Sequence, residues 1–261
     1  MFRLSTRLLQ HLQPYIFPPA CPTCKKVHAT RAINTKPANI NLPEQYGCCA
    51  DCLQDIHLAP INTCYRCGIT LPKSLAPGPC GHCLTQPPPQ KHTRNVFVYR
   101  DTVRTALLAW KLQGQSAGLH WLLQSSAQTL QQVFSPHDLL IPVPMPLSRM
   151  RRSGLHHSAD LCQRIAQITS SQVCHTLLRR TGNHTRQSAL KGKQRLSNLR
   201  KAFMLANDYQ IQLDNYNVQG KIWVVDDILT TGATLRHACK VMKKTQHPIF
   251  AFALARTPSN T

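Results

Sequence analysis

The chain has 261 residues, which is enough for one α/β domain and a smaller module. Lys and Arg outnumber Asp and Glu by 31 to 10, so the formal net charge is +21. This surplus favours a polyanionic partner, such as nucleic acid, an anionic membrane or a phosphorylated small molecule. A basic housekeeping protein without such a partner is the alternative. Chemistry that needs several carboxylates is disfavoured, because Glu44 is the only glutamate.

The segment 1–19 combines basic residues with leucines that fit one face of a short amphipathic helix. It lacks the continuous apolar core and the small-residue cleavage site of a signal peptide, and no stretch of about 18 apolar residues predicts a membrane span. We therefore expect a cytoplasmic protein whose first helix packs against the body. Contact with the inner face of the cell membrane is the alternative role of this helix.

Nine of the twelve cysteines lie within the first 83 residues, most of them in pairs separated by two residues. This spacing favours metal binding in a reducing compartment over disulfides, because a tight turn between the two thiolates directs both at one tetrahedral ion. Core or redox cysteines are the alternative. The pairs predict two closed four-cysteine sites and hence two structural zinc ions, with these ligands: Cys21, Cys24, Cys49 and Cys52 in one set; Cys64, Cys67, Cys80 and Cys83 in the other. Cys48 competes with Cys49, which we prefer because it preserves the repeated spacing.

A proline-rich stretch over 87–94 predicts a stiff linker. We therefore divide the chain into an N-terminal helix with the double zinc module (1–86), the linker (87–94) and an α/β domain (95–261). Hydrophobic patterning predicts elements of that domain in chain order: a strand over 95–99, helices over 101–114 and 119–133, strands over 139–144 and 173–178 with a helix over 159–168 between them, a strand over 221–225, a helix over 233–244 and a strand over 249–254. Alternating strands and helices predict a parallel sheet flanked by helices.

The segment Val224 to Thr234 reads VVDDILTTGAT, so two acids and a short hydroxyl- and glycine-containing loop connect an apolar strand to a helix. At the carboxyl edge of a parallel sheet, such a loop presents backbone N–H groups and a helix N-terminus to an anion. The adjacent carboxylates suit a sugar diol, directly or through Mg²⁺. The acids of a P-loop ATPase are disfavoured because the chain has no G-x4-G-K-[ST] motif. Two acids that merely cap a turn are the remaining alternative.

This segment resembles the 5-phosphoribosyl 1-pyrophosphate (PRPP) signature of type I phosphoribosyltransferases. The resemblance implies that Asp226 and Asp227 contact the ribose hydroxyls and that the loop formed by Thr230, Thr231, Gly232, Ala233 and Thr234 holds the 5-phosphate. From about Pro18 to Arg256 the chain resembles the ComF competence family more closely, because the cysteine pairs precede FVYRDTVRTALLAWKLQG, LLIPVPMPLSRMRRSG and TRQSALKGKQRLSNLRKAF in that family's order. After Gly154 the family continues with Phe-Asn-Gln, where this chain has Leu155, His156 and His157. The resemblance implies a type I phosphoribosyltransferase-like fold with a small, zinc-ribbon-like module that contains both four-cysteine sites.

The steepest concentration of positive charge runs from Arg149 to Lys201. We expect single-stranded DNA to contact residues of this segment and the zinc module. The predicted DNA-binding residues are Arg149, Arg151, Arg152, Arg179, Arg180, Arg186, Lys191, Lys193 and Arg195. In related transferases the part equivalent to 179–201 resembles a mobile flap that closes over pyrophosphate. A solvated basic face without a function is a further alternative.

The resemblance implies a role in DNA uptake and natural transformation, in which the protein handles incoming single strands on the cytoplasmic side. Its expected ligands are single-stranded DNA and PRPP or another ribose 5-phosphate, with Mg²⁺ accompanying PRPP. Other DNA-uptake proteins, such as a helicase or a recombination mediator, are expected partners in a scaffolding role. The alternative function is an enzyme, a phosphoribosyltransferase whose acceptor and catalytic residues the sequence does not identify.

Overall fold

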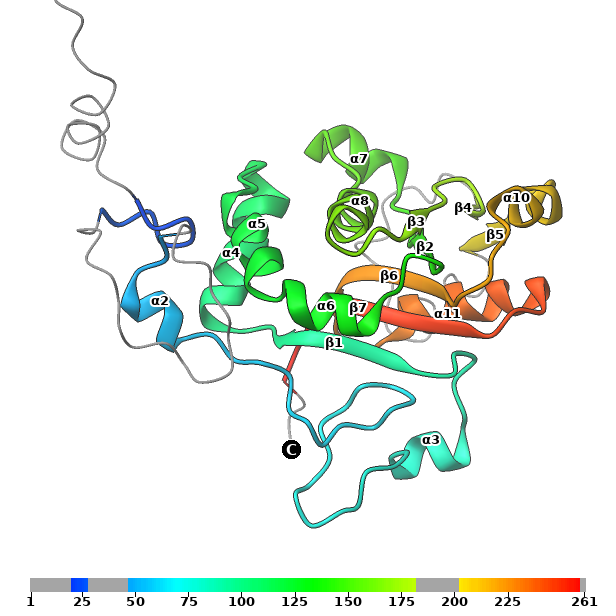
Figure 1. Cartoon of the computed structure of the whole chain (residues 1–261), viewed down its shortest axis with the longest axis horizontal. Coiled ribbons are helices and arrows are strands. Elements are labelled where there is room, and N and C mark those ends of the chain that lie inside the picture. Colours follow the sequence, from blue (N-terminus) through cyan, green and yellow to red (C-terminus); the bar gives the residue numbers. More distant parts are fainter. Residues whose placement is uncertain (1–19, 28–46, 182–201, 259–261) are drawn as a thin grey trace, which may run out of the picture. The chain divides into compact units, whose positions relative to one another are not determined.

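The structure, a computed structural model, describes residues 20–27, 47–181 and 202–258 (Figure 1). They form two compact units: the described residues up to Ile56 with Asp101–Ser126, and His57–Arg100 with the described residues from Ala127 onward. The division into three parts at 87–94 stays a prediction, because contacts between residues define these units and do not test which parts fold independently. The helix expected in 1–19 lies outside the described residues. Within the described ranges, no helix is both long and apolar enough to cross a membrane.

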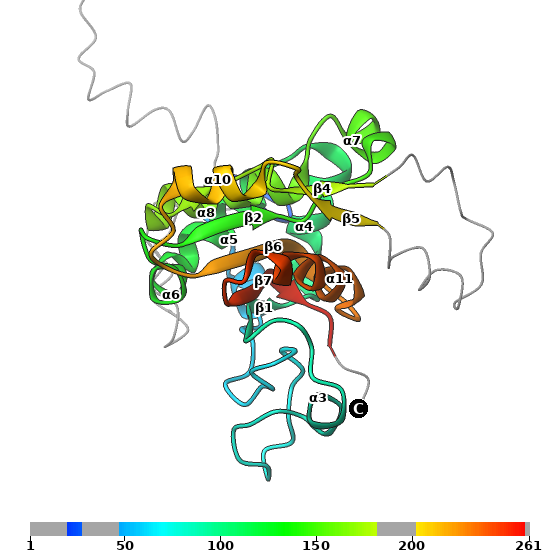
Figure 2. The same ribbon diagram turned by 90° about the vertical axis from the view of Figure 1, so that its right-hand side faces the viewer.

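The second unit is built on a five-stranded sheet in the order β1-β7-β6-β2-β3, and every neighbouring pair of its strands is parallel (Figure 2). An antiparallel pair, β4 and β5, lies outside this sheet. The strands are β1 (Thr93–Val98), β2 (Leu139–Pro142), β3 (Gln172–Val173), β4 (Leu178–Arg180), β5 (Phe203–Leu205), β6 (Ile222–Leu229) and β7 (Ile249–Arg256). The predicted α/β architecture with a parallel sheet is confirmed.

Helices cover both faces of this sheet. The helices of the second unit are α3 (Gly81–Thr85), α6 (Ala127–Val133), α7 (Leu147–Ser153), α8 (His157–Thr169), α10 (Tyr209–Tyr216), α11 (Ala233–Met242) and a 3-10 turn, η2 (Lys243–Thr245). After α6, Phe134 packs edge-on against Trp223, with ring centroids 5.0 Å apart. Val224, the next residue of β6, points to the other face, where it joins the apolar core with Leu235 of α11. Cover on both faces explains why β6 and β7 are mostly apolar.

The outer edge of β1 is covered by the chain that precedes it. The Val98 N–H donates to the His57 carbonyl at 2.8 Å, and the Ala59 N–H donates to the Val96 carbonyl at 2.8 Å. Near the start of the strand, the Thr93 N–H donates to the Tyr65 carbonyl at 2.8 Å. The segment 57–65 therefore satisfies backbone groups that an edge strand otherwise leaves open.

The first unit contains α2 (Ala50–Gln54), α4 (Asp101–Gln113) and α5 (Ala117–Ser125). Gly118 allows a close approach of the last two helices, because a Cβ atom there would lie 2.9 Å from the Cβ of Ala106. The same added atom would lie 3.3 Å from the carbonyl oxygen of Pro22, so the first cysteine pair packs at this position as well.

Three local predictions were wrong. The single helix expected over 119–133 is two helices, because the Ser126 hydroxyl donates to the Leu122 carbonyl at 2.8 Å where α5 ends. The strand expected over 221–225 continues to Leu229, so both acids lie within β6 and not after it. The strand expected over 173–178 is limited to Gln172–Val173, and a separate strand begins at Leu178.

Candidate functional sites

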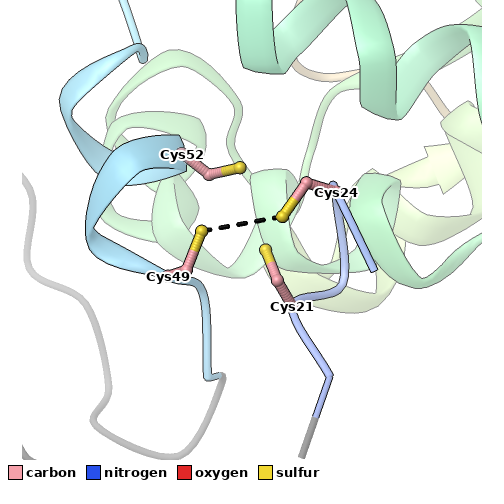
Figure 3. A group of neighbouring side chains, drawn as sticks. All are labelled: Cys21, Cys24, Cys49 and Cys52. Carbon is pink, nitrogen blue, oxygen red and sulfur yellow. Dashed lines mark hydrogen bonds between the residues drawn. The ribbon is translucent and has the colours of Figure 1, made fainter. Parts of the chain in front are cut away.

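The first cysteine set combines a tight turn with the start of a helix (Figure 3). Cys21 and Cys24 lie on the turn, where the Lys25 N–H donates to the Cys21 carbonyl at 3.0 Å. Cys49 is the N-cap of α2, and Cys52 lies in its first turn. The four side chains point toward a common centre in Figure 3.

The second set repeats this construction within the other unit. Cys64 and Cys67 lie on a turn closed by the Gly68 N–H, which donates to the Cys64 carbonyl at 2.7 Å. Cys80 is the N-cap of α3, and Cys83 lies within that helix. The sequence suggested two turns for each ion, whereas the structure uses one turn and one helix start. Lys25 and Gly68 occupy the same position in the two turns, and both have positive φ, 65° and 76°.

The sulfur positions fit a tetrahedral ion. Four thiolates bound to zinc at about 2.3 Å stand about 3.8 Å from one another. The Sγ atoms of Cys24 and Cys49 are 3.7 Å apart, and those of Cys67 and Cys80 are 3.8 Å apart. Within each set, all four sulfurs lie within 4.8 Å of one another. The two predicted sets can therefore each hold one metal ion, with no ligand position left for substrate.

Backbone N–H groups favour the thiolate form in both sets. Burial raises the pKa of Cys21, but N–H groups of Cys49, Cys24 and Thr23 donate to its sulfur and bring the pKa down to about 6. Burial likewise raises the pKa of Cys64, and N–H groups that include that of Cys80, 3.2 Å from the sulfur, lower it to about 7. Each turn thus prepares one ligand in its metal-binding charge state.

Cys48 is a fifth thiol beside the first set. Its Sγ atom is 3.7 Å from that of Cys21, yet Cys49 and not Cys48 belongs to the group whose sulfurs all lie close together. Cys48 is 6% exposed, and burial together with the neighbouring Cys21 sulfur raises its pKa. The geometry therefore favours Cys49 as ligand and a protonated Cys48.

The phosphate loop expected from the sequence connects β6 to α11. Gly232 has φ +75° and is the N-cap of α11, so the loop makes the sharp turn that glycine permits. Thr230 and Thr231 are exposed, while Ala233 and Thr234 are partly buried in the first turn of the helix. Exposed hydroxyls beside a helix N-terminus make a suitable position for one anion.

The acidic pair lies immediately before this loop, on the strand itself. Asp227 is 6% exposed, and Asp226 is partly buried. Oδ1 of Asp226 accepts hydrogen bonds from the Ser158 hydroxyl at 3.1 Å and from the Asp227 N–H at 2.9 Å. These contacts fix the orientation of one carboxylate, and Ser158 was not identified from the sequence, because 68 positions separate it from its partner.

The basic residues fall into three groups. Arg149, Arg151 and Arg152 are exposed on α7, a helix that the sequence did not predict. Arg180 on β4 stacks over the Phe203 ring at 5.5 Å, and burial, with a smaller contribution from the charge of Arg149, lowers its pKa. Arg149 of α7 therefore lies close enough to Arg180 of β4 for their charges to interact. On the same strand, Arg179 is exposed. Arg186, Lys191, Lys193 and Arg195 lie outside the described residues.

The departure from the family pattern after Gly154 falls at the start of α8. His156 is the N-cap, and its Nδ1 atom accepts from the Ala159 N–H at 3.1 Å. His157 is 3% exposed. His156 therefore has a structural role as a helix cap, which an asparagine side chain also performs well.

Two curated bacterial proteins are similar to the chain. "Competence protein F" from Haemophilus influenzae is 27% identical over 207 residues, which cover 76% of this chain and 85% of that protein. "Competence protein ComFC" from Bacillus subtilis is 25% identical over 171 residues, which cover 64% of this chain and 65% of that protein. No family model matches the chain.

Proposed function

Because these relatives support the ComF family and a role in competence, we propose that the protein binds single-stranded DNA during natural transformation and carries a PRPP site on the same domain. The observation that carries the PRPP site is the arrangement of Asp226 and Asp227 before the Gly232 loop and α11. The charge of +21 supports a nucleic-acid partner.

In this proposal the carboxylates of Asp226 and Asp227 bind the ribose hydroxyls, with Mg²⁺ accompanying the pyrophosphate. The loop from Thr230 to Thr234 holds the 5-phosphate through its N–H groups and hydroxyls. Each cysteine set holds one zinc ion in a structural role.

Calorimetric titration of PRPP, with and without Mg²⁺, tests the site. Replacing Thr231 by Leu places an apolar side chain at an exposed loop position, so it should abolish binding and leave the melting temperature within about 2 °C of wild type. Thr129→Leu, at an exposed position of α6, is a control outside the loop. Equal PRPP affinity of wild type and Thr231→Leu would contradict the assignment.

DNA binding is expected to be electrostatic and to have little sequence preference. If the protein engages about four to six phosphates, the slope of log affinity against log salt is about −3 to −4. Replacing Arg149, Arg151 and Arg152 by Gln should make this slope shallower, because these guanidinium groups contact phosphates in the proposal. Anisotropy titrations of a labelled oligonucleotide across a salt series measure both quantities, and unchanged affinity and slope would remove the arginines from the DNA-binding surface.

A second candidate function is a phosphoribosyltransferase. The hydrogen bond between Ser158 and Asp226 favours it, since a fixed carboxylate is useful for positioning a reacting ribose. Release of pyrophosphate from PRPP in the presence of candidate nucleophiles tests this function. If PRPP binds and no nucleophile gives turnover, the site acts in binding alone, and scaffolding of other DNA-uptake proteins becomes the role to test next.

A further inference from the structure

Aromatic rings form a continuous row across the N-terminal ends of three strands in the second unit. Tyr65 and His92 have ring centroids 5.0 Å apart, and His92 stacks on Phe250 at 5.9 Å with an angle of 11° between the rings. Phe250 contacts Trp223 at 5.1 Å. The register of the sheet explains this row, because Trp223 pairs with Phe250 and both side chains therefore lie on the same face.

The outer part of this row is accessible to solvent. Tyr65, His92 and Phe250 are partly exposed, whereas Trp223 is only 3% exposed and anchors the row in the core. Partly exposed rings fixed by packing on a buried ring form a rigid surface, which loses little conformational entropy when a flat ligand stacks on it.

Positive charge surrounds the exposed rings. Lys91, Arg94 and Lys221 are exposed, and Arg66 is partly exposed. Burial lowers the pKa of His92, and all four cations lower it further, so they lie close to one imidazole. Lys221 Nζ is 5.6 Å from the Phe250 ring centroid, and the Arg66 guanidinium carbon is 5.6 Å from that of Tyr65. Among the described residues, none of the four cations forms an ion pair with a carboxylate.

The second cysteine set positions one end of this surface. Tyr65 and Arg66 lie between the ligands Cys64 and Cys67, and their carbonyl oxygens are fixed against β1. The Tyr65 carbonyl accepts from the Thr93 N–H at 2.8 Å, and the Arg66 carbonyl accepts from the Thr93 hydroxyl at 2.7 Å. A metal ion at this set would therefore hold one aromatic ring and one cation in the row.

We propose that this surface, named here the aromatic-basic platform (Tyr65, Arg66, Lys91, His92, Arg94, Lys221 and Phe250), binds single-stranded DNA by stacking bases on its rings and pairing phosphates with its cations. Proteins that bind single strands combine these two features, because every base has a flat face and every nucleotide a phosphate. The proposal rests on the proposed DNA-binding function and adds a contact surface to the arginines of α7.

The Lys221 end of the platform lies far from the PRPP site. Lys221 precedes β6, and Thr230 follows its other end, so the two residues are separated by the length of this extended strand, or about 30 Å. At the other end of the platform, the Cys64 turn approaches the loop, because Leu229 lies beside both Gly68 and Gly232.

The charge test compares two triple variants of the full chain. The platform variant carries Lys91→Gln, Arg94→Gln and Lys221→Gln. The control carries Lys240→Gln, Lys243→Gln and Lys244→Gln, three exposed lysines on α11 and η2, which cover the opposite face of the sheet. Loss of three phosphate contacts should make the slope of log affinity against log salt shallower by about 2. The affinity of the platform variant relative to wild type should therefore be about 100-fold lower at 0.1 M salt than at 1 M salt. The control should keep the wild-type slope. An unchanged slope in the platform variant, or an equal change in the control, would overturn the proposal.

The stacking test compares an oligothymidylate with an abasic strand of the same length. Wild type should prefer the strand with bases by at least about five-fold, the contribution of one stacked base. His92→Ser, which removes a partly exposed ring, should reduce this preference, and adding Phe250→Leu should abolish it. Zinc content and melting temperature verify folding, and His92→Ser alone decides the question if the double variant unfolds. Equal affinity of wild type for both strands would overturn the proposal. If wild type binds no single-stranded DNA, the proposed function fails; if it binds and the platform variants match it, only the platform is wrong.

Discussion

Substitution of two adjacent cysteines distinguishes the metal ligand from its neighbour. Cys49 belongs to a group of four sulfurs within 4.8 Å of one another, while Cys48 approaches Cys21 from outside this group. We expect two zinc ions per chain in wild type, two in Cys48→Ser and one in Cys49→Ser. The double substitution should match Cys49→Ser, because Cys48 cannot replace its neighbour without movement of the backbone.

The expected loss of zinc affinity in Cys49→Ser follows from the number of ligands. The binding free energy of a structural zinc ion held by thiolates is about 10–16 kcal/mol. Each of the four ligands therefore contributes about 3 kcal/mol, so loss of one ligand should lower the zinc affinity about 100-fold. Cys48→Ser instead changes one buried atom that is not a ligand, which costs about 1 kcal/mol in the free energy of unfolding. Elemental analysis after gel filtration with a weak chelator measures zinc per chain. Loss of an ion from Cys48→Ser, with two ions retained in Cys49→Ser, would refute the assignment.

Two further predictions concern residues that hold the sites in place. Ser158→Ala removes the hydroxyl that donates to Asp226. We expect about 10-fold weaker PRPP binding in calorimetry and a loss of about 1.5–3 kcal/mol in the free energy of unfolding. No change in either quantity would mean that Ser158 does not orient the carboxylate. Gly68→Ala places a Cβ atom at φ +76°, 3.2 Å from Oδ1 of Asn95, so zinc should leave the second set faster in a chelator assay, by the equivalent of about 1–2 kcal/mol. Lys25→Gly relieves the same backbone strain in the first set and should slow zinc loss there. Slower zinc loss from Gly68→Ala, or faster loss from Lys25→Gly, would show that strain in the turn does not control metal retention.

Spacing along the chain predicted the features that depend on nearby residues. Pairs of cysteines two residues apart identified both sets, and the apolar run before Asp226 identified the strand that leads into the phosphate loop. The helical role of Cys49 and Cys80 was missed, because a five-residue helix has too few positions to show a hydrophobic period.

Features that depend on register between distant strands were not predictable from the sequence. Tyr65, His92 and Phe250 come from the Cys64 turn and the starts of two strands, and only the pairing of those strands places their rings in one row. The helix α7 was missed for a local reason. Its N-cap is Pro146, and the prolines before it indicated a loop.

The segment that covers the edge of β1 has a consequence for aggregation of the protein. A sheet edge with free backbone groups is a template on which a second chain can add a strand. Here the segment from His57 to Tyr65 occupies that edge, and its far end is joined to the Cys64 turn. Depletion of zinc from the second set should therefore loosen this cover before the sheet itself unfolds. The expected outcome is metal-dependent aggregation of folded protein, which restoring zinc would suppress.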